Sequence, residues 1–318
     1  MSTQISPHTG SNSVEKTVSA DSPACNVCGK IAFDTQYSYP DYDLLRCKAC
    51  GLGMLFPVPQ FDSEDYYDED YYRGGLDQGI GFVVLDPENI KQSREGVSKK
   101  VDWLFARREI TSFLDIGCGI GFFVEAMRQR GIEAVGVDIS KFAVRFGHEE
   151  LGIEGLKAGF FQDVLQPGEQ YDVIYLHHVI EHVPDPKGFV HDCVSFLAPG
   201  GWLVMEAPDI DSAEAVRNGK DWIYILPEHL YYFNIPSLSG LAESQGLAVR
   251  YAEKEIGSPG LLNATFGNED SAKAFYDKWL KNSAAQWCIR LFRKAYASVG
   301  QKVDVDYKFM KIVAEKVR

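Results

Sequence analysis

Histidine and glutamate residues gather in two short stretches of this 318-residue sequence. The first holds His178, Glu181 and His182, and the second holds the adjacent pair Glu228 and His229, which an aromatic run follows. Imidazole is the usual general base near neutral pH, and a neighbouring carboxylate can hold its tautomer. We therefore interpret both stretches as a catalytic cluster, with His229 as the base ahead of His178 and the other three residues as orienting groups.

A helical turn over 179–183 would bring the first stretch onto one face, because residues three and four apart are neighbours on a helix. His178, Glu181 and His182 have this spacing. The alternative is that each histidine caps a strand and forms hydrogen bonds within the fold. For a lone histidine that alternative is the better interpretation, whereas the clustering here favours chemistry.

Cysteines form a separate pattern near the N-terminus. Cys25 and Cys28 make one C-x-x-C pair, and after eighteen residues Cys47 and Cys50 make a second pair, followed by Gly51. Two such pairs offer four thiolates to one tetrahedral zinc ion. We expect this zinc to be structural and away from the chemistry, because it folds a module too small to be stable alone. A redox role is less favoured, since redox C-x-x-C pairs usually open a helix of a larger domain.

A glycine-rich turn, LDIGCGIG over 114–121, joins a predicted strand to a predicted helix. Glycines let the backbone approach a ligand, and a helix N-terminus offers unpaired N–H groups. The dinucleotide fingerprint needs a glycine where Phe122 stands, so the glycines follow G-x-G-x-G instead. Asp138 ends the next predicted strand, where a carboxylate can accept ribose hydroxyls, and Asp163 follows the third strand, where it could bond an adenine amino group.

From Ser112 onward, predicted strands alternate with predicted helices and position these residues. This alternation is the pattern of a parallel α/β sheet. The predicted strands are SFLDI, EAVGVDI, GLKAG, YDVIYL and GWLVMEA, and the helices between them cover 122–130, 142–151 and 187–197. A further helix and strand are predicted within 236–253. We divide the chain into a leader, a zinc ribbon, a linker with a lid helix, a core and a helical C-terminal extension, over 1–22, 23–75, 76–110, 111–258 and 259–318.

The motifs LDIGCGIG, VDIS, FFQD and YDVIYLHHVIEHVPDP, in this order, resemble those of class I S-adenosylmethionine (SAM)-dependent methyltransferases over roughly 112–249. The resemblance implies a Rossmann-like seven-stranded sheet, SAM over the glycine turn and substrate at the carboxyl ends of the strands. It implies that Asp115 supports the turn and the methionine amino group. The residues that it assigns to the cofactor are Asp115, Gly117, Gly119, Gly121, Asp138, Ile139, Asp163 and His177.

The histidine–glutamate cluster resembles motifs found in two branches of that family. In ubiquinone-type O-methyltransferases and small-RNA 2′-O-methyltransferases, an E-x-x-E-H motif and a later histidine are associated with a divalent metal beside the acceptor oxygen, and His178 replaces the first glutamate here. The alternative to a metal-free base is therefore a second divalent metal at His178, Glu181, His182 and His229. Deoxysugar C-methyltransferases carry a cysteine-rich N-terminal segment and a Glu-His base before aromatic residues, which Glu228-His229 matches.

The net charge of −13 argues against a nucleic acid as the main partner, because affinity for phosphates comes largely from Lys and Arg. Residues 1–75 carry five Lys and Arg against eleven Asp and Glu, so the ribbon is a poor RNA clamp. We expect methyl transfer to an oxygen or carbon of a small-molecule acceptor, such as a sugar or a secondary metabolite. The alternatives are an RNA methyltransferase that binds RNA through its ribbon and a non-catalytic SAM-binding protein.

Four further expectations concern the surroundings of the core. The sequence has no run of about 18 apolar residues, so we expect no transmembrane segment. The polar start lacks the features of a signal peptide, which predicts a disordered leader and a cytoplasmic protein. We expect a basic amphipathic helix over 287–296 that packs on the core or forms a homodimer with its copy, with contact to an anionic membrane surface as the less favoured alternative. Tyrosines within 65–72 either line the acceptor pocket or pack the ribbon on the core.

Overall fold

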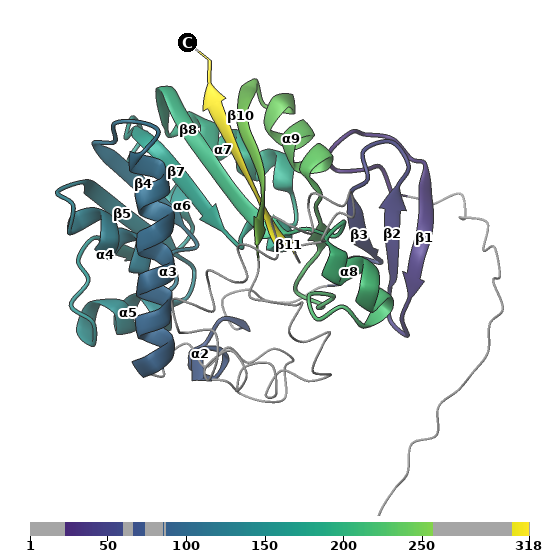
Figure 1. The fold of residues 1–318 in the computed structure, drawn as a ribbon, viewed down its shortest axis with the longest axis horizontal. Coiled ribbons are helices and arrows are strands. Elements are labelled where there is room, and N and C mark those ends of the chain that lie inside the picture. The colour runs from purple at the N-terminus through teal and green to yellow at the C-terminus, as the bar shows by residue number, and fades with distance from the viewer. Residues whose placement is uncertain (1–22, 60–65, 74–84, 86, 257–306, 318) are drawn as a thin grey trace, which may run out of the picture.

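The computed structural model describes residues 23–59, 66–73, 85, 87–256 and 307–317 (Figure 1). This part of the chain forms a seven-stranded sheet of order β10-β11-β8-β7-β4-β5-β6 and a smaller four-stranded sheet. The large sheet confirms the fold that the class I resemblance implied. Its parallel strands are β4 (Ser112–Ile116), β5 (Glu133–Asp138), β6 (Leu156–Ala158), β7 (Tyr171–His177) and β8 (Leu197–Pro208).

Six helices surround the large sheet: α3 (Pro87–Phe105), α4 (Phe122–Arg128), α5 (Lys141–Glu149), α6 (Phe161–Val164), α7 (Pro186–Ser195) and α9 (Ile235–Ser244). Phe113 of β4 packs in the hydrophobic cluster that α3 and α4 complete, and Leu114 packs in the one that α7 and α9 complete. Both faces of the parallel strands are therefore apolar, which explains their continuous hydrophobic runs in the sequence. Because the strands are parallel, the residues that follow β4, β5 and β7 meet at one edge.

The strands β10 (Leu247–Ile256) and β11 (Tyr307–Lys316) complete the sheet, and β11 lies between β8 and β10 and runs antiparallel to both. The prediction of an entirely helical extension is therefore wrong for β11. Ile312 packs toward one face and Val313 toward the other, so β11 lacks the alternation of a half-buried strand. The rest of the expected extension, including the helix expected in a homodimer, falls within 257–306 and lies outside the described residues.

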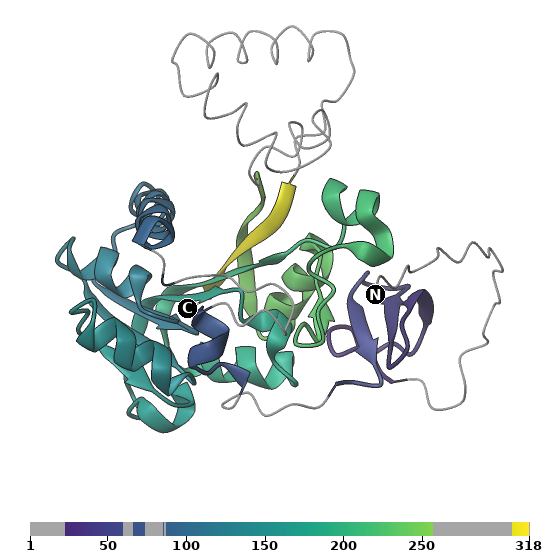
Figure 2. The same ribbon diagram turned by 90° about the horizontal axis from the view of Figure 1, so that it is seen from below.

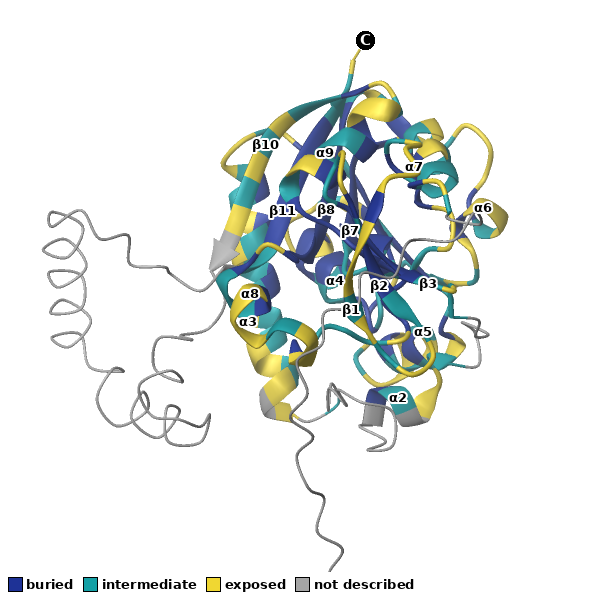
Figure 3. Cartoon of the chain, turned by 90° about the vertical axis from the view of Figure 1, so that its right-hand side faces the viewer, coloured by how far each residue is buried: buried dark blue, intermediate teal, exposed yellow. Residues whose placement is uncertain are grey.

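The zinc-ribbon segment forms three antiparallel strands, β1 (Phe33–Ser38), β2 (Asp43–Cys47) and β3 (Gly53–Phe56). They lie at the opposite end of the molecule from α4 and α5 (Figure 2). The fourth strand of their sheet is β9 (Tyr231–Tyr232), which comes from the core. The outer strand β1 is mostly exposed (Figure 3), whereas β2 and β3 add side chains to the hydrophobic cluster of α7 and α9. The ribbon thus shares both a sheet and a hydrophobic core with the domain behind it.

Short elements lie near the carboxyl ends of the parallel strands: α2 (Glu69–Arg73), the 3-10 helix η2 (Ile180–His182) and α8 (Ala213–Asn218). Helix α2 packs against α5, and η2 packs against β8 and β9. Helix α2, which follows the ribbon in the sequence, and segments of the core therefore come together at the edge where the parallel strands end. None of the helices in the described ranges is at once long enough and apolar enough to cross a membrane.

Candidate active site

The glycine turn between β4 and α4 has the backbone that its sequence predicts. Gly117, Gly119 and Gly121 have φ values of 74°, 52° and 96°, in the left-handed region that favours glycine. A Cβ atom on Gly117 would lie 2.4 Å from Cγ2 of Val179, which precedes η2. The glycine turn is therefore in direct contact with the segment that carries Glu181.

Two buried aspartates flank this turn. Asp138 accepts hydrogen bonds from the N–H of Gly119 at 2.7 Å and from the N–H of Ser140 at 2.8 Å. Burial raises the pKa of Asp138, although both N–H groups act in the opposite direction. Asp115 is 1% exposed, and within the described part of the chain its Oδ1 has no hydrogen-bond partner. Because an unpaired buried carboxylate oxygen is costly, Asp115 fits a site for a ligand's donor or cationic group.

The remaining residues predicted for the cofactor are placed differently. Ile139 is half-buried beside Asp138, and Asp163 is exposed on α6. His177 ends β7, and its ring lies 5.6 Å from that of Phe123, centroid to centroid. Burial lowers the pKa of His177 well below its usual range, so the ring is neutral.

An ion network beside His177 was not predicted from the sequence. Glu206 of β8 is buried, accepts a hydrogen bond from the Tyr175 hydroxyl at 2.6 Å and pairs with Lys100 of α3. Nζ of Lys311, in β11, lies 3.9 Å from the same carboxylate. These residues are far apart in the chain, and only the order of the strands brings them together, so no local pattern announces the network.

His178 starts the turn after β7 with φ of 56°, a left-handed conformation that is uncommon outside glycine and is often found at functional sites. Its Nδ1 lies 3.2 Å from Oε1 of Glu181. The turn that follows is a 3-10 helix, and His182 packs against His229 instead of joining His178. The expected helical turn is present, but it does not bring the three side chains together as predicted: His178 bonds with Glu181, whereas His182 lies beside Glu181 and His229.

The hydrogen bonds of His182 and His229 assign their tautomers. Nδ1 of His182 lies 3.0 Å from the carbonyl oxygen of Glu228, and Nδ1 of His229 lies 2.8 Å from that of Tyr224. Since a carbonyl oxygen only accepts, each ring carries its hydrogen on Nδ1 and a lone pair on Nε2. Burial lowers the pKa of both rings, that of His229 to about 3, so both are neutral near pH 7.

Ligand atoms of Glu181, His182 and His229 lie within 4.8 Å of one another. Among the described residues, Oε2 of Glu181 finds no hydrogen-bond partner. Burial would raise the pKa of Glu181, but the hydrogen bond from His178 and the neighbouring imidazoles lower it. Metal-binding histidines usually donate their other N–H to a carbonyl or carboxylate, as both rings do here. One carboxylate and two neutral imidazoles therefore fit a divalent ion.

The second predicted orienting group, Glu228, has a different contact from the one expected. Its side chain is buried and bonds with the hydroxyl of Tyr66, whereas the carbonyl of Tyr224 orients His229. The sequence could not indicate this carbonyl, because every residue has one.

Tyrosines that precede and form α2 cover the cluster. The Tyr67 hydroxyl lies 3.0 Å from Nδ1 of His182, and the rings of Tyr67 and Tyr71 are 5.0 Å apart, centroid to centroid. Burial raises the pKa of Tyr71 to about 12, with the charges of Glu228 and Asp138 adding to the rise. These aromatic side chains, which the sequence analysis singled out, thus border both the aspartate and the histidine sides of the site.

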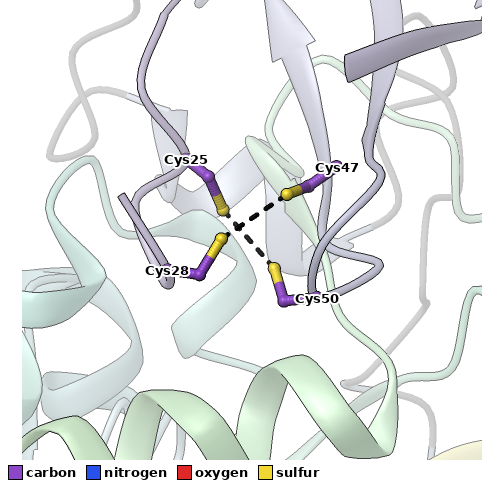
Figure 4. Close-up of side chains that lie close together, drawn as sticks. All are labelled: Cys25, Cys28, Cys47 and Cys50. Atoms are coloured by element: carbon purple, nitrogen blue, oxygen red, sulfur yellow. Dashed lines mark hydrogen bonds between the residues drawn. The ribbon is translucent and has the colours of Figure 1, made fainter. Parts of the chain in front are cut away.

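The four cysteines of the ribbon converge on one point (Figure 4). The Sγ atoms of Cys25 and Cys50 are 3.5 Å apart, and those of Cys28 and Cys47 are 3.6 Å apart. Four sulfurs at tetrahedral Zn–S distances lie about 3.8 Å from one another, so the group matches a zinc site in size. Burial would raise the pKa of Cys47, but N–H groups of Cys50 and Ala49 and the neighbouring thiols lower it to about 7, which favours the thiolate that metals bind.

Comparisons with known proteins agree with this geometry. A family model described as a methyltransferase domain matches residues 90–252, half of the chain. Ubiquinone biosynthesis O-methyltransferases of Salmonella arizonae and Klebsiella pneumoniae are each 30% identical over 115 residues, which cover 35% of this chain and 45% of theirs. The chain thus matches less than half the length of these curated relatives.

Solved structures also resemble the chain. A SAM-dependent methyltransferase from Archaeoglobus fulgidus is 23% identical with a TM-score of 0.48, over 70% of this chain and 94% of that one. A plantazolicin methyltransferase in complex with SAH is 16% identical with a TM-score of 0.45, over 73% of this chain and 91% of that one. With its glycine turn, its sheet order and the matching family model, the chain belongs to the methyltransferase-domain family and is a class I SAM-dependent methyltransferase.

Proposed function

We propose that this methyltransferase methylates an oxygen of a small molecule that a divalent cation holds at Glu181, His182 and His229. One observation carries the proposal: a buried carboxylate and two neutral imidazoles bring their ligand atoms within 4.8 Å of one another. The tautomers support it as well, since both Nδ1–H groups are engaged by carbonyls and both Nε2 atoms keep a lone pair.

The bound cation would supply Lewis acidity, which lowers the pKa of an acceptor hydroxyl. The protein's own residues hold and shape the site. The hydrogen bond with His178 keeps the Glu181 carboxylate turned inward. The carbonyls of Glu228 and Tyr224 prevent the rings of His182 and His229 from flipping. His229 acts here as a ligand and not as an unassisted base.

On the donor side of the site, where SAM as the methyl donor would bind, we assign Asp138 to the ribose hydroxyls. Asp138 can accept further hydrogen bonds beside those from Gly119 and Ser140. The unpaired Oδ1 of Asp115 suits the methionine ammonium group. The glycine turn lets the backbone approach the cofactor, and the contact between Gly117 and Val179 sets the distance from donor to acceptor. The exposed Asp163 would reach the adenine amino group from α6.

Tyr67 gives the acceptor a hydrogen-bond donor. Because the Nδ1–H of His182 donates to a carbonyl, it can also donate to the Tyr67 oxygen at 3.0 Å, but it cannot accept from it. The hydroxyl hydrogen of Tyr67 is therefore directed away from His182. We assign it to an oxygen of the acceptor, beside Tyr71.

A small acceptor with a hydroxyl group fits these features best. The ubiquinone biosynthesis relatives, which match part of the chain, are O-methyltransferases by name. The chain is acidic, with a net charge of −13, and the buried groups around the cluster include the carboxylates of Glu181 and Glu228. This charge suits a metal-bound hydroxyl better than an RNA backbone.

We further propose that the four cysteines hold one structural zinc ion. Their sulfur spacing supports this assignment.

The function is tested with SAM and a panel of catechols, phenols and sugars, with the products followed by mass spectrometry. We expect a methylated hydroxyl compound, loss of turnover after chelation, and recovery with Mg²⁺, Mn²⁺ or Zn²⁺. His229→Ala should lower turnover at least about 100-fold and leave SAM binding intact, whereas His191→Ala, on α7, serves as the control. Full activity of chelated enzyme and of His229→Ala would contradict the proposal.

A further inference from the structure

The ribbon touches both halves of the acceptor site through the short strand β9. This strand starts two residues after His229 and pairs with β3, with Met54 opposite Tyr231 and Gly53 opposite Tyr232. The N–H of Leu55 also donates to the carbonyl of Leu230 at 3.1 Å. The backbone that follows His229 therefore forms an edge strand of the ribbon sheet.

The hydroxyl of Tyr231 connects the ribbon to the other half of the site. It donates to the carbonyl of Pro184, two residues after His182, at 2.9 Å. It also accepts a hydrogen bond from the side chain of Asn26, which lies between Cys25 and Cys28. Tyr231 is 2% exposed, so this bridge is not in competition with water.

The second cysteine turn holds the same segment from its other end. A Cβ on Gly51, which follows Cys50, would lie 2.6 Å from Nδ2 of Asn234, so the two segments are in van der Waals contact. Nδ2 of Asn234 donates to Asp211 at 2.7 Å, and Arg46 of β2 pairs with the same carboxylate at 2.5 Å. Contacts from both cysteine turns therefore hold the segment 231–234, which begins two residues after His229.

We infer that the four-cysteine ribbon is a positioning element of the acceptor site, which fixes Glu228 and His229 against η2 through β9 and the Tyr231 hydroxyl. This inference rests on the proposed function for the role of His229, but not for the packing itself. Within the described residues, the hydrogen bonds and the close contact that hold the turn after β4 come from Asp138 and Val179 of the core, and not from the ribbon. Loss of the ribbon's metal should therefore loosen the acceptor side and spare SAM binding.

Hydrogen–deuterium exchange tests the inference without an acceptor. Full-length protein is compared as wild type, as wild type stripped of metal by a chelator, and as Cys47→Ser. We expect amides of 226–234 to exchange about tenfold faster or more in the last two samples, because their pairing partner β3 is lost. Amides of the glycine turn and of α3 should exchange as in the wild type, and calorimetric SAM affinity should change by less than about twofold.

A milder pair of variants separates positioning from folding of the ribbon. Tyr231→Phe removes only the hydroxyl bridge, whereas Tyr39→Phe removes a different ribbon-to-core bond, to the carbonyl of Lys220 at 2.7 Å. We expect Tyr231→Phe to raise exchange over 226–234 and over 180–184 about fivefold, and to weaken Mn²⁺ binding at the acceptor site by a similar factor. Tyr39→Phe should change neither.

Two outcomes would overturn the inference. One is wild-type protection of 226–234 in metal-free protein whose ribbon amides, over 33–56, exchange freely. The other is faster exchange throughout the glycine turn and α3, which would make the ribbon a stabiliser of the whole domain. If Mn²⁺ does not bind the wild type at all, the proposed function fails, and the exchange pattern still decides the role of the ribbon.

Discussion

The imidazole rings of His182 and His229 lie edge to face, with their centroids 4.6 Å apart. The two residues belong to segments that follow β7 and precede β9, and each ring is held by a backbone carbonyl. Two neutral rings beside a buried carboxylate are what the proposed metal site requires, because each ring keeps a lone pair on Nε2 for a cation.

Tyr67 should contribute to the reaction through its hydroxyl. Tyr67→Phe keeps the ring that packs on Tyr71 but removes the donor assigned to the acceptor. We expect the kcat/KM for the acceptor to fall about fivefold to tenfold, with SAM affinity unchanged, because one hydrogen bond is lost. Tyr171→Phe is the control, since that hydroxyl bonds Glu169 at the far end of β7. Equal kcat/KM values for the two variants would show that the Tyr67 hydroxyl does not contribute to acceptor binding.

Asp138 should govern the affinity for SAM. Asp138→Ala removes the carboxylate that we assign to the ribose hydroxyls and also releases the N–H of Gly119. Isothermal calorimetry should show SAM binding at least about tenfold weaker, while Asp138→Asn, which keeps one oxygen, should lose less. Binding of SAM to the alanine variant with wild-type affinity would refute the donor-site assignment.

The zinc content of the protein should depend on the four cysteines of the ribbon. Elemental analysis is expected to give about one zinc per chain in the wild type and none in Cys47→Ser, and the variant should unfold at a lower temperature or in lower yield. Cys193→Ser, at a buried cysteine outside the ribbon, is the control for loss of a thiol. A zinc-free Cys47→Ser protein with wild-type yield and melting temperature would contradict a structural zinc.

The stability should depend on pH through Asp172, which ties β7 to β4. Its carboxylate accepts bonds from the N–H and hydroxyl of Thr111, each at 2.7 Å, and from the N–H of Ser112 at 3.2 Å. Burial would raise the pKa of Asp172, but these bonds and the charge of Arg108 lower it. A carboxylate with a depressed folded pKa stabilises the protein above its unfolded pKa, and this contribution is lost as pH falls through the folded value.

Asp172→Ala should therefore lower the Tm by about 2–4 °C at neutral pH. The difference from the wild type should shrink below about pH 4, as the native carboxyl becomes protonated. Thermal unfolding at several pH values measures this, with Glu150→Ala, an exposed substitution, as the control. A Tm difference that stays constant into acid would show that Asp172 does not act through its charge.

Much of the donor side was predictable because its signals are local. The glycine turn, Asp138 and the five parallel strands each appear as a short pattern, since buried parallel strands are continuously apolar and left-handed turns need glycine. The strand β11 was mistaken for a helix because it is buried on both faces and includes Lys311, whose partner Glu206 is distant in the sequence. In the sequence alone, a lysine within an apolar run looks like a residue on the exposed face of an amphipathic helix. Only the structure shows that Lys311 is buried beside Glu206.

The acceptor side depends on contacts that no local pattern describes. Histidine and glutamate spacing predicted Glu181, His182 and His229, whose ligand atoms lie close together in the structure, but it also placed His178 on their face of a helical turn. The ribbon was identified from its cysteines, yet the pairing of β3 with β9 is a tertiary contact between distant segments. The types of the side chains therefore indicated which residues could belong to the site, and the order of the strands decided which of these residues lie close together.

Mn²⁺ binding tests the acceptor site most directly, because it needs no knowledge of the acceptor. Full-length protein with its ribbon zinc in place is titrated with Mn²⁺ and examined by electron paramagnetic resonance with ¹⁵N-labelled histidine. Metal-assisted transfer predicts about one bound Mn²⁺ per chain with couplings to two histidine nitrogens. It also predicts loss of this signal in both Glu181→Gln and His229→Ala, but not in His191→Ala. An enzyme that transfers methyl groups yet binds no Mn²⁺, or binds it equally in all three variants, would contradict the assignment.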